Sequence, residues 1–244
     1  MQYHPVHATT SEELRVVVIV GVATVLYLAY HLLSSRAATA RFFPAEAADD
    51  DRLRTRAAFW RRWVGAALFG LVPALPAALF IPGGLDACGL NLHDPFRGLY
   101  LSLAFTALTL PLSYLQSRKP SFREHYPEVR APLTGRTAAW NVASWAAYLV
   151  AYELFFRGYL VLGLAPVVGP LPAVAISLMG YVWVHLGKHP GEAVGTLVSG
   201  TWFGLVALHT GSVLGPIVAH LAIAVCSDHF AAMHGPRRAP EVAR

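Results

Sequence analysis

The feature that most constrains the fold of this chain is a series of long apolar stretches that are nearly free of charged residues. Of its 244 residues, 55% are hydrophobic and only 14% are charged, whereas about 25% are charged in a typical soluble domain. A helix needs roughly 20 mostly apolar residues to cross the hydrocarbon core of a bilayer. The sequence therefore predicts an all-α, polytopic helix bundle in a membrane.

The apolar stretches predict about seven transmembrane helices. They cover Leu14–Leu33, Val64–Ile81, Leu99–Leu115, Ala138–Leu164, Leu171–Leu186, Ala193–Leu208 and Val213–Met233. On this basis we divide the chain into three parts. An N-terminal membrane scaffold (1–137) with three helices and basic loops precedes a C-terminal membrane core (138–234) and a short cytoplasmic tail (235–244).

The Lys and Arg residues are distributed unevenly between the two ends of these helices. Sixteen lie on one side: seven in 34–62, five in 116–137, Lys188, and three after Met233. Only Arg15 and Arg97 lie on the other side. Because cytoplasmic loops carry an excess of Lys and Arg, we expect the N-terminus outside and the C-terminus in the cytoplasm. The first stretch lacks the basic start of a secretion signal, so we expect a retained anchor.

Several classes of protein are excluded by composition. Two cysteines, Cys88 and Cys226, lie in separate segments, which excludes a disulfide framework or a four-thiolate zinc site. The net charge is +5, but the chain has neither a phosphate-binding glycine-rich loop nor a basic and aromatic surface module. We therefore expect no nucleic-acid partner.

Four ionisable residues fall inside the predicted helices of the C-terminal half. Glu153 and Arg157 have i, i+4 spacing and share a helix face, while His185 and His220 lie on two later helices. Taken singly, the Glu–Arg pair could simply neutralise itself, and a histidine could bond a backbone carbonyl. Ionisable groups inside a membrane are costly and usually functional, so their combination on core helices indicates a site.

A carboxylate and two imidazoles in a dry cavity support a limited chemistry. A carboxylate with a neighbouring imidazole can remove a proton from water, and a second imidazole can donate to the oxyanion that forms when a peptide carbonyl is attacked. Glu153, His185 and His220 could also hold zinc with an open water position, although the sequence has no His-Glu-x-x-His helix. We expect no cofactor, with zinc as the alternative.

These segments resemble the CAAX-protease and bacteriocin-processing family of intramembrane peptidases, also called the Abi family. That family has three motifs in order: Glu-Glu-x-x-x-Arg, Phe-x-x-x-His and His-x-x-x-Asn/Asp. The resemblance covers about Ala138–Asp228. The corresponding segments of this chain are Tyr152-Glu153-x-x-x-Arg157, Tyr181-x-x-x-His185 and His220-x-x-x-Ala224.

The resemblance implies a glutamic-type endopeptidase. In this assignment Glu153 and His185 activate water, His220 donates to the oxyanion, and Arg157 supports the carboxylate. Tyr181 takes the place of the motif phenylalanine.

Two positions depart from the family pattern. Tyr152 replaces the first acidic residue, as in a branch of the family with an aromatic-Glu-x-x-x-Arg motif, and Ala224 replaces the Asn or Asp. Asp228, one turn further along the last helix, could partly replace the missing Asn or Asp, or it could lie at the cytoplasmic membrane edge.

The leading hypothesis is a multi-pass endopeptidase of a bacterial inner membrane. It would cleave in or near a membrane segment of an anchored protein or peptide. The substrate would be a sorting tail, as for the myxosortase-like members that this chain resembles, or a leader or pheromone precursor. One alternative is an inactive relative that acts as a membrane scaffold or immunity protein. Another is a proton-coupled transporter, although no internal repeat is evident.

Overall fold

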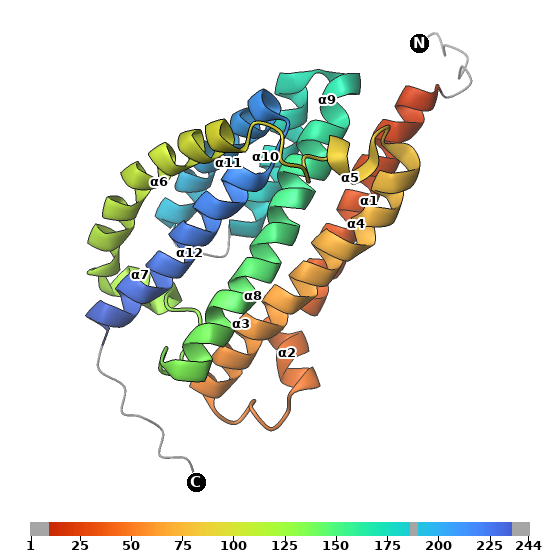
Figure 1. The fold of residues 1–244 in the computed structure, drawn as a ribbon. Coiled ribbons are helices and arrows are strands. Elements are labelled where there is room, and N and C mark those ends of the chain that lie inside the picture. The colour runs from red at the N-terminus through yellow and green to blue at the C-terminus, as the bar shows by residue number, and fades with distance from the viewer. Residues whose placement is uncertain (1–9, 186–189, 236–244) are drawn as a thin grey trace, which may run out of the picture.

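The computed structural model of the chain describes residues 10–185 and 190–235, and each regular element in these ranges is a helix (Figure 1). The predicted all-α fold is thereby confirmed. The tail beyond Gly235, including its three arginines, and Lys188 lie outside the described residues.

Two of the helices change pitch along their length and are therefore given as linked segments. The π-helical segments η1 and η2 each join two α-helical segments into one continuous helix. The elements are α1 (Ser11–Leu33), α2 (Arg36–Phe42), α3 (Asp50–Ala66), η1 (Ala67–Leu71), α4 (Val72–Phe80), α5 (Gly84–Ala87), α6 (Pro95–Ser117), α7 (Pro120–His125), α8 (Gly135–Glu153), η2 (Leu154–Leu162), α9 (Gly163–Val168), α10 (Pro170–His185), α11 (Pro190–Thr210) and α12 (Leu214–His234).

Five helices of the described chain are long and apolar enough to cross a membrane: Ser11–Leu33, Asp50–Phe80, Pro95–Ser117, Gly135–Val168 and Leu214–His234. They indicate a multi-pass membrane protein. The other two predicted stretches correspond to Pro170–His185 and Val194–Thr210, which are apolar but shorter within the described residues. At 1.5 Å per residue, the 16 residues of α10 extend about 24 Å, less than the roughly 30 Å hydrocarbon core.

Local sequence signals explain where several helices begin. Thr10 caps α1 in a reciprocal capping box with Glu13, which satisfies backbone donors at the helix start. Pro95 and Pro120 occupy the first positions of α6 and α7. Proline is favoured there because the first helical N–H has no partner within the helix.

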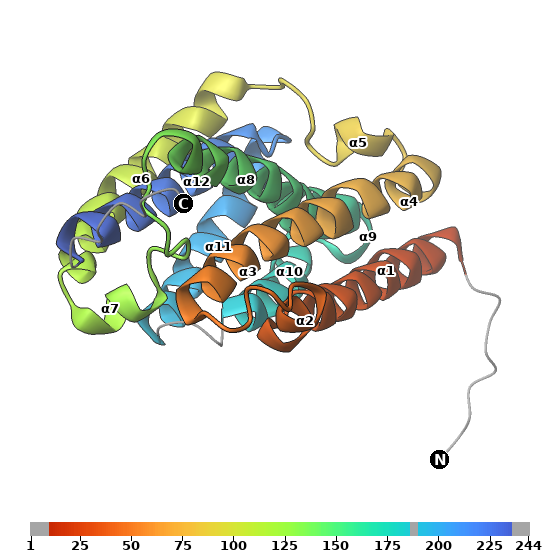
Figure 2. The same cartoon turned by 90° about the horizontal axis from the view of Figure 1, so that it is seen from below.

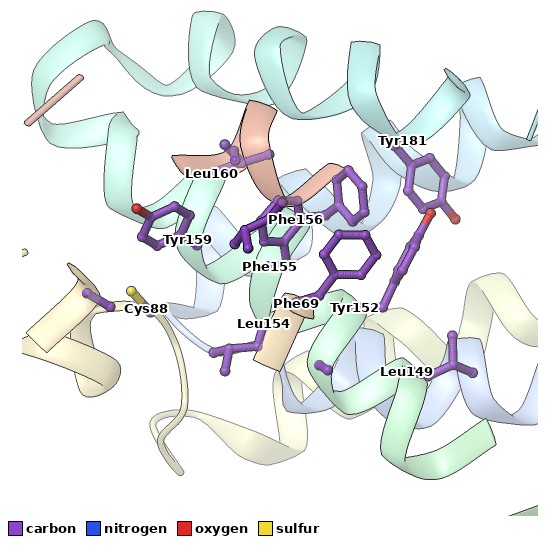
Figure 3. Packing of buried hydrophobic residues seen from close by; sticks show 14 of the residues in the cluster. Phe69, Cys88, Leu149, Tyr152, Leu154, Phe155, Phe156, Tyr159, Leu160 and Tyr181 are labelled. Carbon is purple, nitrogen blue, oxygen red and sulfur yellow. The ribbon is translucent and has the colours of Figure 1, made fainter. Parts of the chain in front are cut away.

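The continuous helix Gly135–Val168 forms the centre of the bundle. In the most apolar 18-residue stretch of this helix 67% of the residues are buried, whereas in that of Ser11–Leu33 only 22% are buried. Its first segment, α8, lies between α3 on one side and α12 on the other (Figures 1 and 2). Around it, aromatic rings of α8, η1 and η2 form the apolar core, with Phe69 stacked on Phe155 at 4.7 Å between centroids (Figure 3). The outer helices expose apolar side chains on the surface of the bundle.

A buried polar network joins the N-terminal half of the chain to the last helix. The Arg62 guanidinium on α3 donates to Asn141 Oδ1 at 2.7 Å and lies 3.0 Å from the Glu128 carboxylate and 3.4 Å from that of Asp228. It also lies 3.7 Å from the centre of the Trp145 ring. Arg62 and Asp228 are both fully buried. The first 137 residues therefore do more than surround the core: they hold α8 and α12 in place.

Helices α6 and α12 approach each other closely at a pair of glycines. A Cβ atom on Gly215 would lie 2.2 Å from the carbonyl oxygen of Gly98 and 2.8 Å from the hydroxyl of Ser102. Both distances are far below van der Waals contact, so only glycine fits. Small residues at such positions allow membrane helices to pack backbone against backbone.

Gly215→Ala is expected to destabilise the protein by about 1–3 kcal/mol, because the added methyl group overpacks this contact. Thermal unfolding of the purified protein in detergent should show a lower midpoint. Gly21→Ala on α1 is the control, since no atom lies within 4 Å of its Cβ position. Equal midpoints for the two variants would contradict the close approach of α6 and α12.

Candidate functional site

The structure brings together Glu153, Arg157 and His220, three of the four ionisable residues singled out from the sequence. Glu153 is the last residue of α8, and its Oε1 atom lies 2.5 Å from Nδ1 of His220 on α12. Arg157, one turn later, donates to the same oxygen at 3.2 Å. The Glu153 side chain has no exposed surface, whereas 15% of the His220 side chain is exposed. A single carboxylate is therefore shared by a guanidinium and an imidazole.

The helix containing this cluster changes its pitch at the cluster itself. The π-helical segment η2 begins directly after Glu153 and continues through Leu162. Such segments are rare and often occur at functional sites. The Arg157 guanidinium is held 4.1 Å from the centre of the Tyr181 ring, a cation–π contact that helps to keep a buried charge in place.

Two polar atoms of this cluster have no hydrogen-bond partner among the described residues: Glu153 Oε2 and Arg157 Nη2. Both side chains are at least 99% buried. Buried polar atoms are nearly always paired, and exceptions call for an explanation such as a bound water or a catalytic role. The cluster therefore has unused hydrogen-bonding capacity next to the imidazole of His220.

His220 opens onto a cavity of about 640 Å³ within the bundle. The cavity is also lined by Tyr152, Tyr181 and His185, whereas Glu153 lies behind its wall. Other lining residues lie at the C-terminal ends of α1 and α6, including His31 and Gln116. The first three long helices thus contribute to the cavity and do not serve solely as a lipid-facing scaffold. The volume is that of a typical ligand pocket.

His185 lies in the same cavity but has different partners from those the sequence predicted. Its Nδ1 donates to the backbone oxygen of Tyr181 at 2.8 Å, and its Nε2 lies 3.7 Å from the Glu192 carboxylate on α11. The Glu192 carboxylate in turn accepts a hydrogen bond from the Tyr126 hydroxyl, which lies 2.9 and 3.0 Å from the two carboxylate oxygens. The imidazole in contact with Glu153 is that of His220, so the cavity has two separate carboxylate–imidazole pairs.

Tyr181 connects the two pairs. Its ring centroid lies 5.0 Å from that of His185 and 6.3 Å from that of His220. The Tyr152 ring packs against it at 5.6 Å (Figure 3). The Tyr152 hydroxyl, at the position of the family's first acidic residue, has no hydrogen-bond partner among the described residues. The two tyrosines therefore form the aromatic wall between the imidazoles.

The structure also shows what surrounds Ala224 of the third motif and the nearby Asp228. Ala224 lines the cavity and offers no polar group there. Asp228 accepts hydrogen bonds from Trp145 at 2.8 Å and from the backbone of Glu128 at 3.0 Å, and it belongs to the buried Arg62 network. These contacts explain its burial without a role next to His220.

The predicted zinc alternative is not supported by the positions of the candidate ligands. Among the described residues, no group of three or more His, Cys, Asp or Glu side chains is arranged to hold a metal ion. Oε1 of Glu153 is already engaged by Arg157 and His220. Glu153, His185 and His220 therefore do not form a zinc site in this arrangement.

The two cysteines are free thiols, as the sequence predicts. Cys88 lies in the segment between α5 and α6, and its burial raises the pKa of its thiol to about 11. Since the thiolate is the nucleophile, Cys88 is unsuited to nucleophilic catalysis.

Glu192 and Tyr126 are the residues of this site that sequence reasoning missed. Glu192 comes seven residues after His185, across the connection between two helices. A carboxylate at that distance from a candidate catalytic histidine is a signal the sequence contains. The tyrosine gives no such signal, because it reaches Glu192 only through the folded loop after α7.

A helical membrane protein with an internal cavity, two imidazoles and buried carboxylates has the features of an intramembrane hydrolase. Comparison with protein families places the C-terminal half more specifically. Residues 135–226 match the Rce1-like family, described as type II CAAX prenyl endopeptidase Rce1-like. This part of the chain is thus similar to Rce1-like domains, and proteins with such a domain are typically intramembrane proteases. Comparisons with curated proteins and with solved structures find no match.

Proposed function

We propose that this protein is an endopeptidase that hydrolyses a peptide bond in or next to a membrane segment of another protein. The observation that carries the proposal is the Glu153–His220 contact of 2.5 Å on the wall of a 640 Å³ cavity that also contains His185. The Rce1-like match over residues 135–226 supports the same reaction class.

In the proposed mechanism, His185 is the base and His220 is the oxyanion donor. The Nδ1 proton of His185 is donated to a carbonyl, so in this tautomer Nε2 is the nitrogen that accepts a proton. Nε2 removes a proton from water, and the water oxygen attacks the peptide carbonyl carbon. The oxyanion of the tetrahedral intermediate accepts a hydrogen bond from Nε2–H of His220. The intermediate then collapses, the C–N bond breaks, and His185 returns its proton to the leaving amine.

Glu153 and Arg157 prepare His220 for this role. Nδ1–H of His220 donates to the Glu153 carboxylate, which orients the ring. In the proposed role both ring nitrogens carry a proton and act as donors. With that form present, two cations share one carboxylate, so the cluster has a net positive charge next to the developing oxyanion. Fixed charges of this kind act strongly in a site of low dielectric constant.

The cavity also suggests how a substrate would reach the site. Its lining includes residues at the C-terminal ends of α1, α6 and α10, the end that the distribution of basic residues predicts to be cytoplasmic. We propose that a hydrophobic segment of a membrane-anchored substrate enters from that end. The aromatic walls provided by Tyr152, Tyr181 and Phe203 suit an apolar chain.

The proposal is tested with a library of membrane-anchored reporters. Each reporter has one hydrophobic segment of about 20 residues, flanked by randomised sequence, in either orientation. Wild-type protein is expected to release a defined subset. His220→Ala should lower release of that subset by about 10²–10³-fold, the effect of removing one oxyanion donor. Sequencing of released and retained reporters gives the measurement.

His209→Ala is the matched control, because His209 is an exposed histidine on α11, and it should release the same subset as wild type. If wild type and His220→Ala release the same reporters to the same extent, the protein is not this hydrolase, and the inactive-scaffold hypothesis takes its place. Cleavage abolished by a chelator and restored by zinc would contradict the metal-free mechanism.

A further inference from the structure

We propose that Glu192 is the carboxylate that binds the attacking water together with His185, the role that the motif pattern assigns to Glu153. This inference rests on the proposed function and adds a catalytic residue from α11, outside the three motifs. It also explains how a chain with Tyr152 at the family's first acidic position retains a water-activating carboxylate.

The first support is geometric. α10 ends at His185, and Glu192 lies in the first turn of α11, which begins at Pro190. The Glu192 Oε1 atom lies 3.7 Å from His185 Nε2, and both residues line the cavity. This separation is longer than a hydrogen bond, and a water beside the pair can reach both atoms.

The second support is access to water. Glu153 has no exposed side-chain surface, whereas 23% of the Glu192 side chain is exposed. The Glu153 Oε1 atom is also occupied by Arg157 and His220. Of the two carboxylates in this region, Glu192 is the one that reaches the cavity, so it is the one that can contact a substrate water.

The third support is the way Glu192 is held. The Tyr126 hydroxyl lies 2.9 and 3.0 Å from the two carboxylate oxygens of Glu192. Tyr126 is itself buried, with only 8% of its surface exposed. Tyr126 lies in the segment after α7 and restricts the rotation of the carboxylate. We assign it as a positioning residue, since it contacts the carboxylate and not the reacting atoms.

These contacts define what each group does to the water. In the tautomer that donates from Nδ1 to the Tyr181 carbonyl, Nε2 of His185 is an acceptor, and the Glu192 carboxylate is also an acceptor. A water between them therefore gives one hydrogen bond to each, which directs a lone pair of its oxygen outward. When the oxygen attacks a peptide carbonyl carbon, one proton passes to Nε2 and the other O–H bond stays intact. No further reactant is needed.

A purely structural explanation of Glu192 makes a different prediction. Glu192 lies in the first turn of α11, where a negative charge is favoured by the helix dipole by about 0.3–1 kcal/mol. If this were its only role, Glu192→Gln would lower stability slightly and leave the rate of the chemical step unchanged. The two explanations therefore predict different kcat values for Glu192→Gln.

The experiment uses the full-length protein and the reporter that wild type releases fastest. Glu192→Gln is expected to lower kcat by about 10²–10³-fold with KM changed less than about threefold. Glu192→Asp should recover part of the rate, because it restores a carboxylate. Tyr126→Phe should give a smaller loss of kcat. Glu12→Gln is the matched control, since Glu12 is an exposed acidic residue in the first turn of α1, and it should behave as wild type.

Folding is checked separately by thermal unfolding in detergent and by binding of the uncleaved reporter. A folded Glu192→Gln variant that binds the reporter and cleaves it at the wild-type rate would overturn the inference. If that rate persists while His220→Ala is inactive, only the role of Glu192 is lost and the proposed function stands. If wild type itself releases no reporter above the His220→Ala level, the proposed function fails, and the role of Glu192 fails with it.

Discussion

Glu153→Gln is expected to lower reporter cleavage by about 10²–10³-fold and to destabilise the protein by about 3–5 kcal/mol. The rate falls because a neutral amide holds the His220 ring in its orientation less firmly than the carboxylate does. Stability falls because Arg157, 1% exposed, loses its counter-charge while remaining buried. Initial rates on the fastest reporter and thermal unfolding in detergent measure the two effects.

A double variant separates the two effects. Arg157→Met alone should also destabilise the protein, since it leaves the Glu153 carboxylate with only the imidazole as counter-charge. In Glu153→Gln/Arg157→Met neither charge remains, so stability should return to within about 2 kcal/mol of wild type. Cleavage should stay low, because His220 still lacks its carboxylate. Recovery of both stability and activity in the double variant would show that Glu153 serves only to neutralise Arg157.

Arg62→Met is expected to give the largest loss of stability without touching the cavity pairs, about 3–5 kcal/mol. The methionine fills similar volume but leaves the Asp228 carboxylate fully buried without its guanidinium, and Glu128 loses one of its two arginine partners. The contact with the Trp145 ring is lost as well. Thermal or denaturant unfolding in detergent measures the change.

The control for Arg62 is Arg54→Met on the same helix. Arg54 pairs with Asp50, but 42% and 56% of their side chains are exposed, and such pairs typically contribute about 0–1 kcal/mol. A loss for Arg62→Met no larger than for Arg54→Met would contradict the structural role of the buried network. Partial rescue by Arg62→Met/Asp228→Asn would support it, since that pair of changes removes both charges.

Hydropathy located the apolar helices, and within the described residues five of them are long enough to cross a membrane while two are shorter. The stretches Leu171–Leu186 and Ala193–Leu208 satisfied the composition criterion, yet α10 is only 16 residues long. An apolar helix can be apolar because it faces lipid or because it packs inside a bundle, and composition does not distinguish the two environments. The orientation of the chain remains a prediction from its basic residues.

Part of the candidate site was predictable as a set of residues, although Glu192 and Tyr126 were missed, and its contacts were not predictable. Helical spacing placed Glu153 and Arg157 on one face, and the structure has them 3.2 Å apart. Which imidazole meets the carboxylate depends on how α12 packs against α8, and that is a long-range property. The resemblance to the motifs pointed to His185, whereas the contact is made by His220.

By itself, the sequence determined the membrane environment, the approximate helices and the ionisable groups worth examining, because hydropathy and i, i+4 spacing are local properties. Only the tertiary structure decided which groups meet. It pairs Glu153 with His220, places Glu192 beside His185, and commits Asp228 to Arg62. These partnerships join residues up to 166 positions apart, and helix packing, which no local pattern encodes, selects them.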